Sequence, residues 1–172
     1  IKEKYPECLV VFGGHSVDEG GTLIESEDYV DVLTFGEGEK TFSDMLINLK
    51  NGEIGKTDNI SYRKDGSIVK TPRSYCTSLE DYPSPYTTGV FDEIVENSKG
   101  MELLSVLETT RGCPYSCAYC DWCAGKKMRF FPIEKVYEEI KWLSENKITY
   151  CFCADSNFGM FDRDIEIAQK LI

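Results

Sequence analysis

The sequence predicts an α/β protein with parallel strands, built from two partial units joined by a linker. Short apolar runs of strand length alternate with stretches whose apolar residues recur at helical spacing. Most of the predicted strands run directly into a loop of glycine or polar residues. Because parallel α/β folds gather binding groups at the carboxyl ends of strands, these loops are the candidate functional sites.

Residues 1–56 predict the C-terminal half of a doubly wound domain. The apolar run 8–12 ends in the Gly-Gly-His-Ser segment 13–16, and a second strand within 27–35 ends in the Gly-Glu-Gly-Glu segment 36–39. A helix with one apolar face follows from Thr41 and ends at Asn51-Gly52. Taken alone, the two glycine loops are explained equally well as tight turns.

Residues 57–102 predict a linker that contains a β-hairpin. Asp65-Gly66 is a strong two-residue turn signal within the hairpin 60–70. The prolines at 72, 83 and 85 then punctuate a stretch of little periodicity, and residues 91–97 predict a short helix. We interpret this segment as a spacer between the two units.

Residues 103–172 predict the first β/α units of a partial barrel similar to a TIM barrel. The apolar strand 103–107 is followed by a helix that begins at Pro132. A second strand over 148–154 leads into the polar loop 155–159, and Asp162 is a candidate cap for a last helix.

Three cysteines in the loop after the first of these strands form the strongest chemical motif. Cys113, Cys117 and Cys120 have the spacing C-x3-C-x2-C, so one loop can supply three thiolates to one metal centre. A structural zinc site usually takes four ligands in two separated pairs, whereas three cysteines suit a 4Fe–4S cluster with one open iron. A zinc knuckle and a ferredoxin-like cluster are the alternatives, and Cys123 could supply a fourth thiolate.

Composition excludes several classes of function. The 172 residues carry 19 basic and 30 acidic side chains, a net charge of −11, which disfavours nucleic acid and anionic membranes as partners. There is no apolar run of membrane-spanning length and no signal segment. Eight cysteines without a secretory signal indicate reduced thiols in a cytoplasmic protein. Both ends look cut, so we expect a fragment of a longer enzyme that is inactive alone.

The cysteine segment resembles the start of a radical S-adenosylmethionine (SAM) enzyme. Tyr119 stands at the aromatic position of the C-x3-C-x-aromatic-C hallmark. The sequence of residues 108–122 and 152–159 is similar to that of the cobalamin-dependent branch. The resemblance implies that Cys113, Cys117 and Cys120 ligate a 4Fe–4S cluster. SAM would bind its fourth iron and be cleaved reductively to a 5′-deoxyadenosyl radical.

The same resemblance implies positions that contact SAM. Tyr119 would pack near the adenine, and Asp155, Ser156 and Asn157 would bind the methionyl ammonium group. The usual Gly-Gly-Glu is absent from this place in the chain. The alternative is that Asp155 only caps the end of its strand.

The two glycine loops are similar to later loops of cobalamin-binding domains that are fused to radical SAM barrels. The implied cobalamin positions are Gly13, Gly14, Gly36, Glu37 and Gly38. The Asp-x-His-x-x-Gly segment that ligates cobalt in other cobalamin proteins is absent from this chain. His15 does not match that motif, so we interpret it as a loop histidine.

The resemblance implies an enzyme that uses SAM, a 4Fe–4S cluster and cobalamin to methylate an unactivated carbon. We expect a small-molecule or peptide substrate and a reductant such as flavodoxin or ferredoxin. A cobalamin-dependent rearrangement or cyclisation without methyl transfer is one alternative. A non-catalytic iron–sulfur electron-transfer module is the other.

Overall fold

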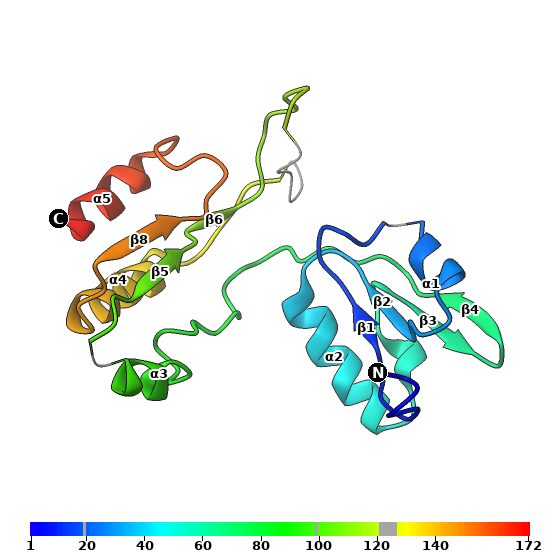
Figure 1. Cartoon of the computed structure of the whole chain (residues 1–172). Coiled ribbons are helices and arrows are strands. Elements are labelled where there is room, and N and C mark those ends of the chain that lie inside the picture. The colour runs from blue at the N-terminus through cyan, green and yellow to red at the C-terminus, as the bar shows by residue number, and fades with distance from the viewer. Residues whose placement is uncertain (19, 99, 121–126) are drawn as a thin grey trace. The chain divides into compact units, whose positions relative to one another are not determined.

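The computed structural model describes residues 1–18, 20–98, 100–120 and 127–172 (Figure 1). The chain divides into two compact units, Ile1–Cys76 and Thr77–Ile172. The division falls inside the predicted linker, so the first unit is longer than the sequence suggested. Within the described ranges, none of the helices combines the length and apolar composition that crossing a bilayer requires.

The first unit contains a four-stranded mixed sheet in the order β1-β2-β3-β4. Strand β1 (Val11–Phe12) runs parallel to β2 (Val32–Thr34), as predicted. Strands β3 (Ile60–Lys64) and β4 (Ser67–Lys70) form the predicted hairpin, but β3 pairs antiparallel with β2. The hairpin is therefore part of the first unit's sheet, whereas the sequence placed it in the linker.

The core of the first unit explains why the hairpin joins the sheet. Val32 and Leu33 are both fully buried and belong to different core clusters, so β2 is covered on both faces. Ile60 and Tyr62 of the hairpin pack in the same cluster as Val32 and Met45. Without the hairpin, this side of β2 would lose the buried neighbours Ile60 and Tyr62.

The helices of the first unit bury fewer of their apolar side chains than the sequence predicted. Helix α2 (Gly38–Lys50) begins three residues before the predicted Thr41 and buries Thr41 and Met45, whereas Phe42 and Leu46 stay about half exposed. A short helix α1 (Thr22–Ser26) and the 3-10 turn η1 (Ile54–Lys56) were not predicted. Both are shorter than the window over which helical periodicity becomes visible.

The second unit follows the predicted order of strand, helix, strand and helix (Figure 1). Strand β5 (Leu104–Leu107) is parallel to β8 (Tyr150–Cys153), and helices α4 (Ile133–Glu145) and α5 (Asp162–Leu171) follow β5 and β8. One core unites both helices with β5 through the buried residues Leu107, Val136, Ile140 and Ile167. The short helix predicted over 91–97 is present as α3 (Asp92–Asn97).

The opposite face of the β5–β8 pair is apolar and exposed. More than half of each of these four side chains is accessible: Leu104, Val106, Tyr150 and Phe152. They line a hollow of about 470 Å³ together with Tyr86 and Phe91. The Tyr86 hydroxyl donates a hydrogen bond to the Val106 carbonyl and accepts one from the Val106 N–H at 3.1 Å. The segment before β5, which belongs to the second unit, therefore packs on the β5–β8 pair and satisfies the backbone of Val106 at the edge of β5.

Candidate functional site

A two-stranded ladder forms the stem of the cysteine loop. Strand β6 (Thr110–Arg111) pairs antiparallel with β7 (Arg129–Phe130), and the Phe131 N–H donates to the Thr109 carbonyl at 3.1 Å. The loop leaves this stem beyond the carboxyl end of β5 (Figure 1). Strands of two residues lie below the reach of periodicity, so the sequence did not predict this stem.

Asp155 ties the end of β8 to the start of the cysteine loop. Its Oδ1 atom accepts hydrogen bonds from the N–H groups of Thr109 at 2.6 Å and Thr110 at 2.9 Å. Its Oδ2 atom accepts a hydrogen bond from the Thr109 hydroxyl. Because Thr109 is fully buried, these bonds satisfy polar groups that water does not reach. This geometry matches the strand-end cap that the sequence offered as the alternative role of Asp155.

Asn157 contacts the first cysteine of the motif directly. Its Nδ2 atom lies 3.1 Å from the Sγ atom of Cys113, which makes the amide a hydrogen-bond donor to sulfur. Both side chains are partly buried, and Ser156 between Asp155 and Asn157 is partly buried as well. The polar loop after β8 and the cysteine loop after β5 therefore meet, as the shared edge of parallel strands predicts.

The three motif cysteines are free of disulfides and differ in exposure. Cys113 is partly buried, whereas Cys117 and Cys120 are exposed and are linked by a turn in which the Cys120 N–H donates to the Cys117 carbonyl at 3.1 Å. Tyr119 is 92% exposed. Among the described residues, no three side chains of the metal-ligating types converge on one point. The donor chemistry of three free thiols on one loop still fits an iron–sulfur cluster. Cys123 lies outside the described residues.

An arginine that the sequence analysis did not single out supports the base of this loop. The guanidinium group of Arg111 binds the Glu108 carboxylate with Nε–Oε1 and Nη2–Oε2 distances of 3.0 and 2.9 Å. Its Cζ atom also lies 5.4 Å from the ring centroid of Tyr82 and 5.6 Å from that of Phe131. The opposite charges three residues apart, directly before Cys113, were the sequence signal for this pair.

The far end of the polar loop is fixed by Asp164 rather than by the predicted cap, Asp162. The Oδ2 atom of Asp164 accepts hydrogen bonds from the N–H groups of Gly159 and Phe161, both at 3.0 Å. Asp164 is buried, and Asp162 is instead the exposed first residue of α5. A carboxylate inside the first turn reaches back to these orphan N–H groups, and it also favours the positive end of the helix.

The glycine loops of the first unit lie at one edge of its sheet. Gly13 and Gly14 follow β1, and Gly36 follows shortly after the parallel strand β2. Gly14 and Gly36 have φ angles of +86° and +70°, which favour glycine. A Cβ atom on Gly13 would lie 2.4 Å from the Thr34 Oγ1 atom. Glu37 flanks the first turn of α2, which begins at Gly38. The five predicted cobalamin positions therefore share the carboxyl edge of β1 and β2.

Comparison with known proteins relates the whole chain to one group of enzymes. It is 38% identical over 179 aligned residues to the cobalamin-dependent radical SAM methyltransferase TokK of Streptomyces tokunonensis, covering 99% of this chain and 26% of that protein. A 2-(S-pantetheinyl)-carbapenam-3-carboxylate methyltransferase of Streptantibioticus cattleyicolor matches with the same identity and coverage. The whole chain is homologous to cobalamin-dependent radical SAM enzymes. It spans about a quarter of the length of these relatives.

Other comparisons give related proteins of lower sequence identity. An anaerobic magnesium-protoporphyrin IX monomethyl ester cyclase of Synechocystis is 28% identical over 91% of this chain and 32% of its own length. The cobalamin-dependent radical SAM enzyme OxsB, solved with aqua-cobalamin and SAM, has a TM-score of 0.68 and 22% identity over 95% of this chain and 23% of that one. TsrM of Kitasatospora setae, solved with cobalamin and a 4Fe–4S cluster, has a TM-score of 0.63 and 19% identity over 96% of this chain and 33% of that one. These likenesses show a shared fold. No family model matches the chain.

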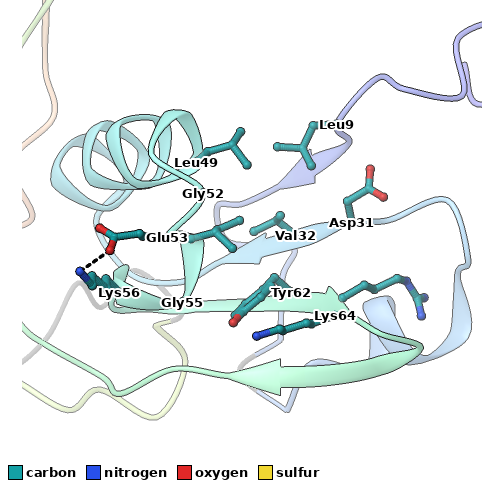
Figure 2. Close-up of a pocket in the computed structure, with 12 residues that line it drawn as sticks. Leu9, Asp31, Val32, Leu49, Gly52, Glu53, Gly55, Lys56, Tyr62 and Lys64 are labelled. Carbon is teal, nitrogen blue, oxygen red and sulfur yellow. Dashed lines mark hydrogen bonds and ion pairs between the residues drawn. The ribbon is translucent and has the colours of Figure 1, made fainter.

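A hollow in the first unit lies away from the glycine loops. It measures about 500 Å³, and Figure 2 shows Leu49 of α2 and Leu9 on its wall together with the Glu53–Lys56 ion pair. Leu9 precedes β1 and Asp31 precedes β2, so this hollow lies at the amino edge of the parallel strands. The glycine loops follow the same strands and occupy the opposite edge.

Proposed function

We propose that this chain is part of a cobalamin-dependent radical SAM methyltransferase, in which Cys113, Cys117 and Cys120 hold a 4Fe–4S cluster. One observation carries the proposal: three free thiols lie on one loop whose stem is fixed to the carboxyl ends of two parallel strands. The match at 38% identity to two methyltransferases over the whole chain supports the same activity.

When bound, the cluster supplies the electron that cleaves SAM, and cobalamin carries the methyl group. The chain's own residues bind and orient these groups. The thiols provide soft ligands for iron. The stem and Asp155 fix the first residues of the loop. The loop therefore loses less conformational freedom when it binds the cluster. The left-handed Gly14 and Gly36 allow the backbone to approach a cofactor closely.

The proposed SAM contacts are unequal in the support that they receive. Asp155 already accepts three hydrogen bonds from Thr109 and Thr110, which favours its role as a strand-end cap. Asn157 is engaged with Cys113. Tyr119 remains the proposed neighbour of the adenine, since this residue is 92% exposed and lies between the second and third cysteines. Ser156 completes the proposed set on the same polar loop.

Two functions other than methyl transfer are the alternatives. A radical cyclisation without methyl transfer is favoured by the match to the Synechocystis cyclase, although its identity to this chain is lower. The electron-transfer module requires a fourth thiolate at Cys123.

We propose a small-molecule or peptide substrate for the whole protein and a flavodoxin or ferredoxin as reductant, in a reduced cytoplasmic setting.

The test uses the full-length protein, reconstituted anaerobically with iron, sulfide and cobalamin. After addition of SAM and a reductant, we expect 5′-deoxyadenosine to form and isotope-labelled methyl groups from SAM to appear on the bound cobalamin. Replacing Cys113, Cys117 or Cys120 by Ala should remove most of the iron and abolish SAM cleavage. Cys8→Ala, which changes an exposed cysteine of the first unit, is the matched control and should retain both. A wild-type cluster that leaves SAM intact would contradict the proposal.

A further inference from the structure

The hydrogen bond between Asn157 and Cys113 joins residues 44 positions apart in the chain. The Asn157 Nδ2 atom lies 3.1 Å from the Cys113 Sγ atom, within the partly buried contact between the two loops. It is the first cysteine of the motif that receives this bond. Cys113 is also the motif cysteine nearest in sequence to the stem, since it lies two residues after β6.

The surrounding backbone holds both partners in place. The Ala154 N–H donates to the Leu107 carbonyl at 2.9 Å, which carries the β5–β8 register to the strand ends. Asp155 then fixes Thr109 and Thr110 from its side of the contact. Asn157 lies two residues after Asp155. The hydrogen bonds between the ends of β5 and β8 therefore hold its amide next to the sulfur atom.

We propose that Asn157 is a positioning residue that donates a hydrogen bond to the Cys113 thiolate and raises the reduction potential of the cluster. The inference rests on the proposed function, because it requires Cys113 to be a cluster ligand. One-electron reduction adds negative charge to the cluster and its thiolates. A hydrogen-bond donor stabilises the more negative state more strongly, and hydrogen bonds to sulfur are an established control of cluster potentials.

The experiment is a redox titration, followed by EPR, of the reconstituted full-length protein in the absence of SAM. Asn157→Leu keeps the approximate size of the side chain and removes the donor. We expect the reduction equilibrium of the cluster to become about tenfold less favourable, which corresponds to a potential about 59 mV lower for one electron. Asn157→Asp should lower the potential further, because a carboxylate adds negative charge beside the sulfur.

Matched variants separate this role from a structural one. Phe158, the next residue of the same loop, has no polar side-chain atom. Phe158→Leu should therefore leave the reduction potential unchanged. Asn157→Gln retains an amide donor and should return part of the shift. If the Leu and Asp variants lose iron, retention of the cluster by the Gln variant supports the donor role, whereas loss in all three variants overturns it.

The remaining outcomes are also distinct. A fully assembled Leu or Asp variant with the wild-type potential overturns the inference while leaving the proposed function intact. If such a variant shows only weaker SAM binding, Asn157 acts on SAM and the inference is wrong. A wild-type protein that assembles no cluster overturns the proposed function itself.

Discussion

The carboxylate of Asp155 accepts hydrogen bonds from both the N–H and the hydroxyl group of Thr109, which lies 46 residues earlier in the chain. A third bond comes from the Thr110 N–H at 2.9 Å. Thr109 and Thr110 are buried, with 0% and 4% exposure. Asp155 therefore supplies the hydrogen-bond acceptor that water would provide at an exposed site. The end of β8 thereby fixes the start of the cysteine loop.

Asp155→Ala should loosen this junction, because it leaves two buried N–H groups without their acceptor at about 1–3 kcal/mol each. We expect amide hydrogen exchange at Thr109 and Thr110 to accelerate by about tenfold or more in the full-length protein, since about 1.4 kcal/mol corresponds to a factor of ten. Asp155→Asn should be much milder, because its remaining oxygen can still accept both N–H groups.

Asp162→Ala is the control for the Asp155 variants, since Asp162 is an exposed carboxylate at the start of α5. It should leave the exchange of Thr109 and Thr110 unchanged. If Asp155→Ala instead weakened SAM binding while these amides stayed protected, the ammonium-binding role implied by the sequence resemblance would be favoured over the cap.

The close approach of Gly13 to Thr34 gives a second prediction. Gly13→Ala should destabilise the first unit by about 1–3 kcal/mol, because its Cβ would lie 2.4 Å from the buried Thr34 Oγ1 atom. It should also lower the amount of cobalamin retained after reconstitution. Thermal unfolding of the double variant Gly13→Ala/Thr34→Ala should show recovery, since the clashing oxygen is gone. Gly38→Ala has open space around the new Cβ and serves as the stability control. Equal losses in Gly13→Ala and the double variant would rule out the clash.

Glu139 on α4 gives a prediction about pH. Burial raises the pKa of its carboxyl above the ordinary 4.5, and the hydrogen bond with Ser84 only partly offsets that effect. The folded state therefore favours the protonated form, whose contribution to stability is complete below pH 4.5 and is lost as the pH rises through the folded pKa. Glu139→Gln, which stays neutral, should melt at a higher temperature than the wild type at pH 7, and this advantage should vanish near pH 4. Glu138→Gln changes an exposed neighbour and should show no such pH-dependent gain. A constant difference across the pH range would contradict the burial argument.

Spacing along the sequence predicted the second unit well. The apolar runs and the helical periodicity each reflect a local period, and β5, α4, β8 and α5 were all placed to within about two residues. The meeting of the Asp155 loop with the cysteine loop also followed, because parallel strands end at one edge.

What the sequence could not predict depends on partners far apart in the chain. The hairpin 60–70 was identified, but its pairing with β2 is a non-local choice made by the shared core of Val32 and Ile60. The acceptor role of Asp155 depends on Thr109, and the donor role of Asn157 depends on Cys113. Residue type alone could not separate these contacts from direct binding of SAM.

Cys123 decides between the enzyme and the electron-transfer module. The three-cysteine motif is complete without it, so we expect Cys123→Ala in the full-length protein to keep four irons per cluster and to keep SAM cleavage. Iron content by chemical analysis and 5′-deoxyadenosine by chromatography are the measurements. Loss of the cluster in this variant, with retention in Cys8→Ala, would make Cys123 a ligand.

We propose above all that three thiolates of the cysteine loop leave one iron of the cluster open to SAM. The most direct measurement is the EPR spectrum of the reduced cluster in the full-length wild-type protein, recorded before and after addition of SAM. We expect a changed spectrum, because SAM would bind the open iron. An identical spectrum at saturating SAM, from a cluster with full iron content, would contradict it and indicate a closed four-thiolate site.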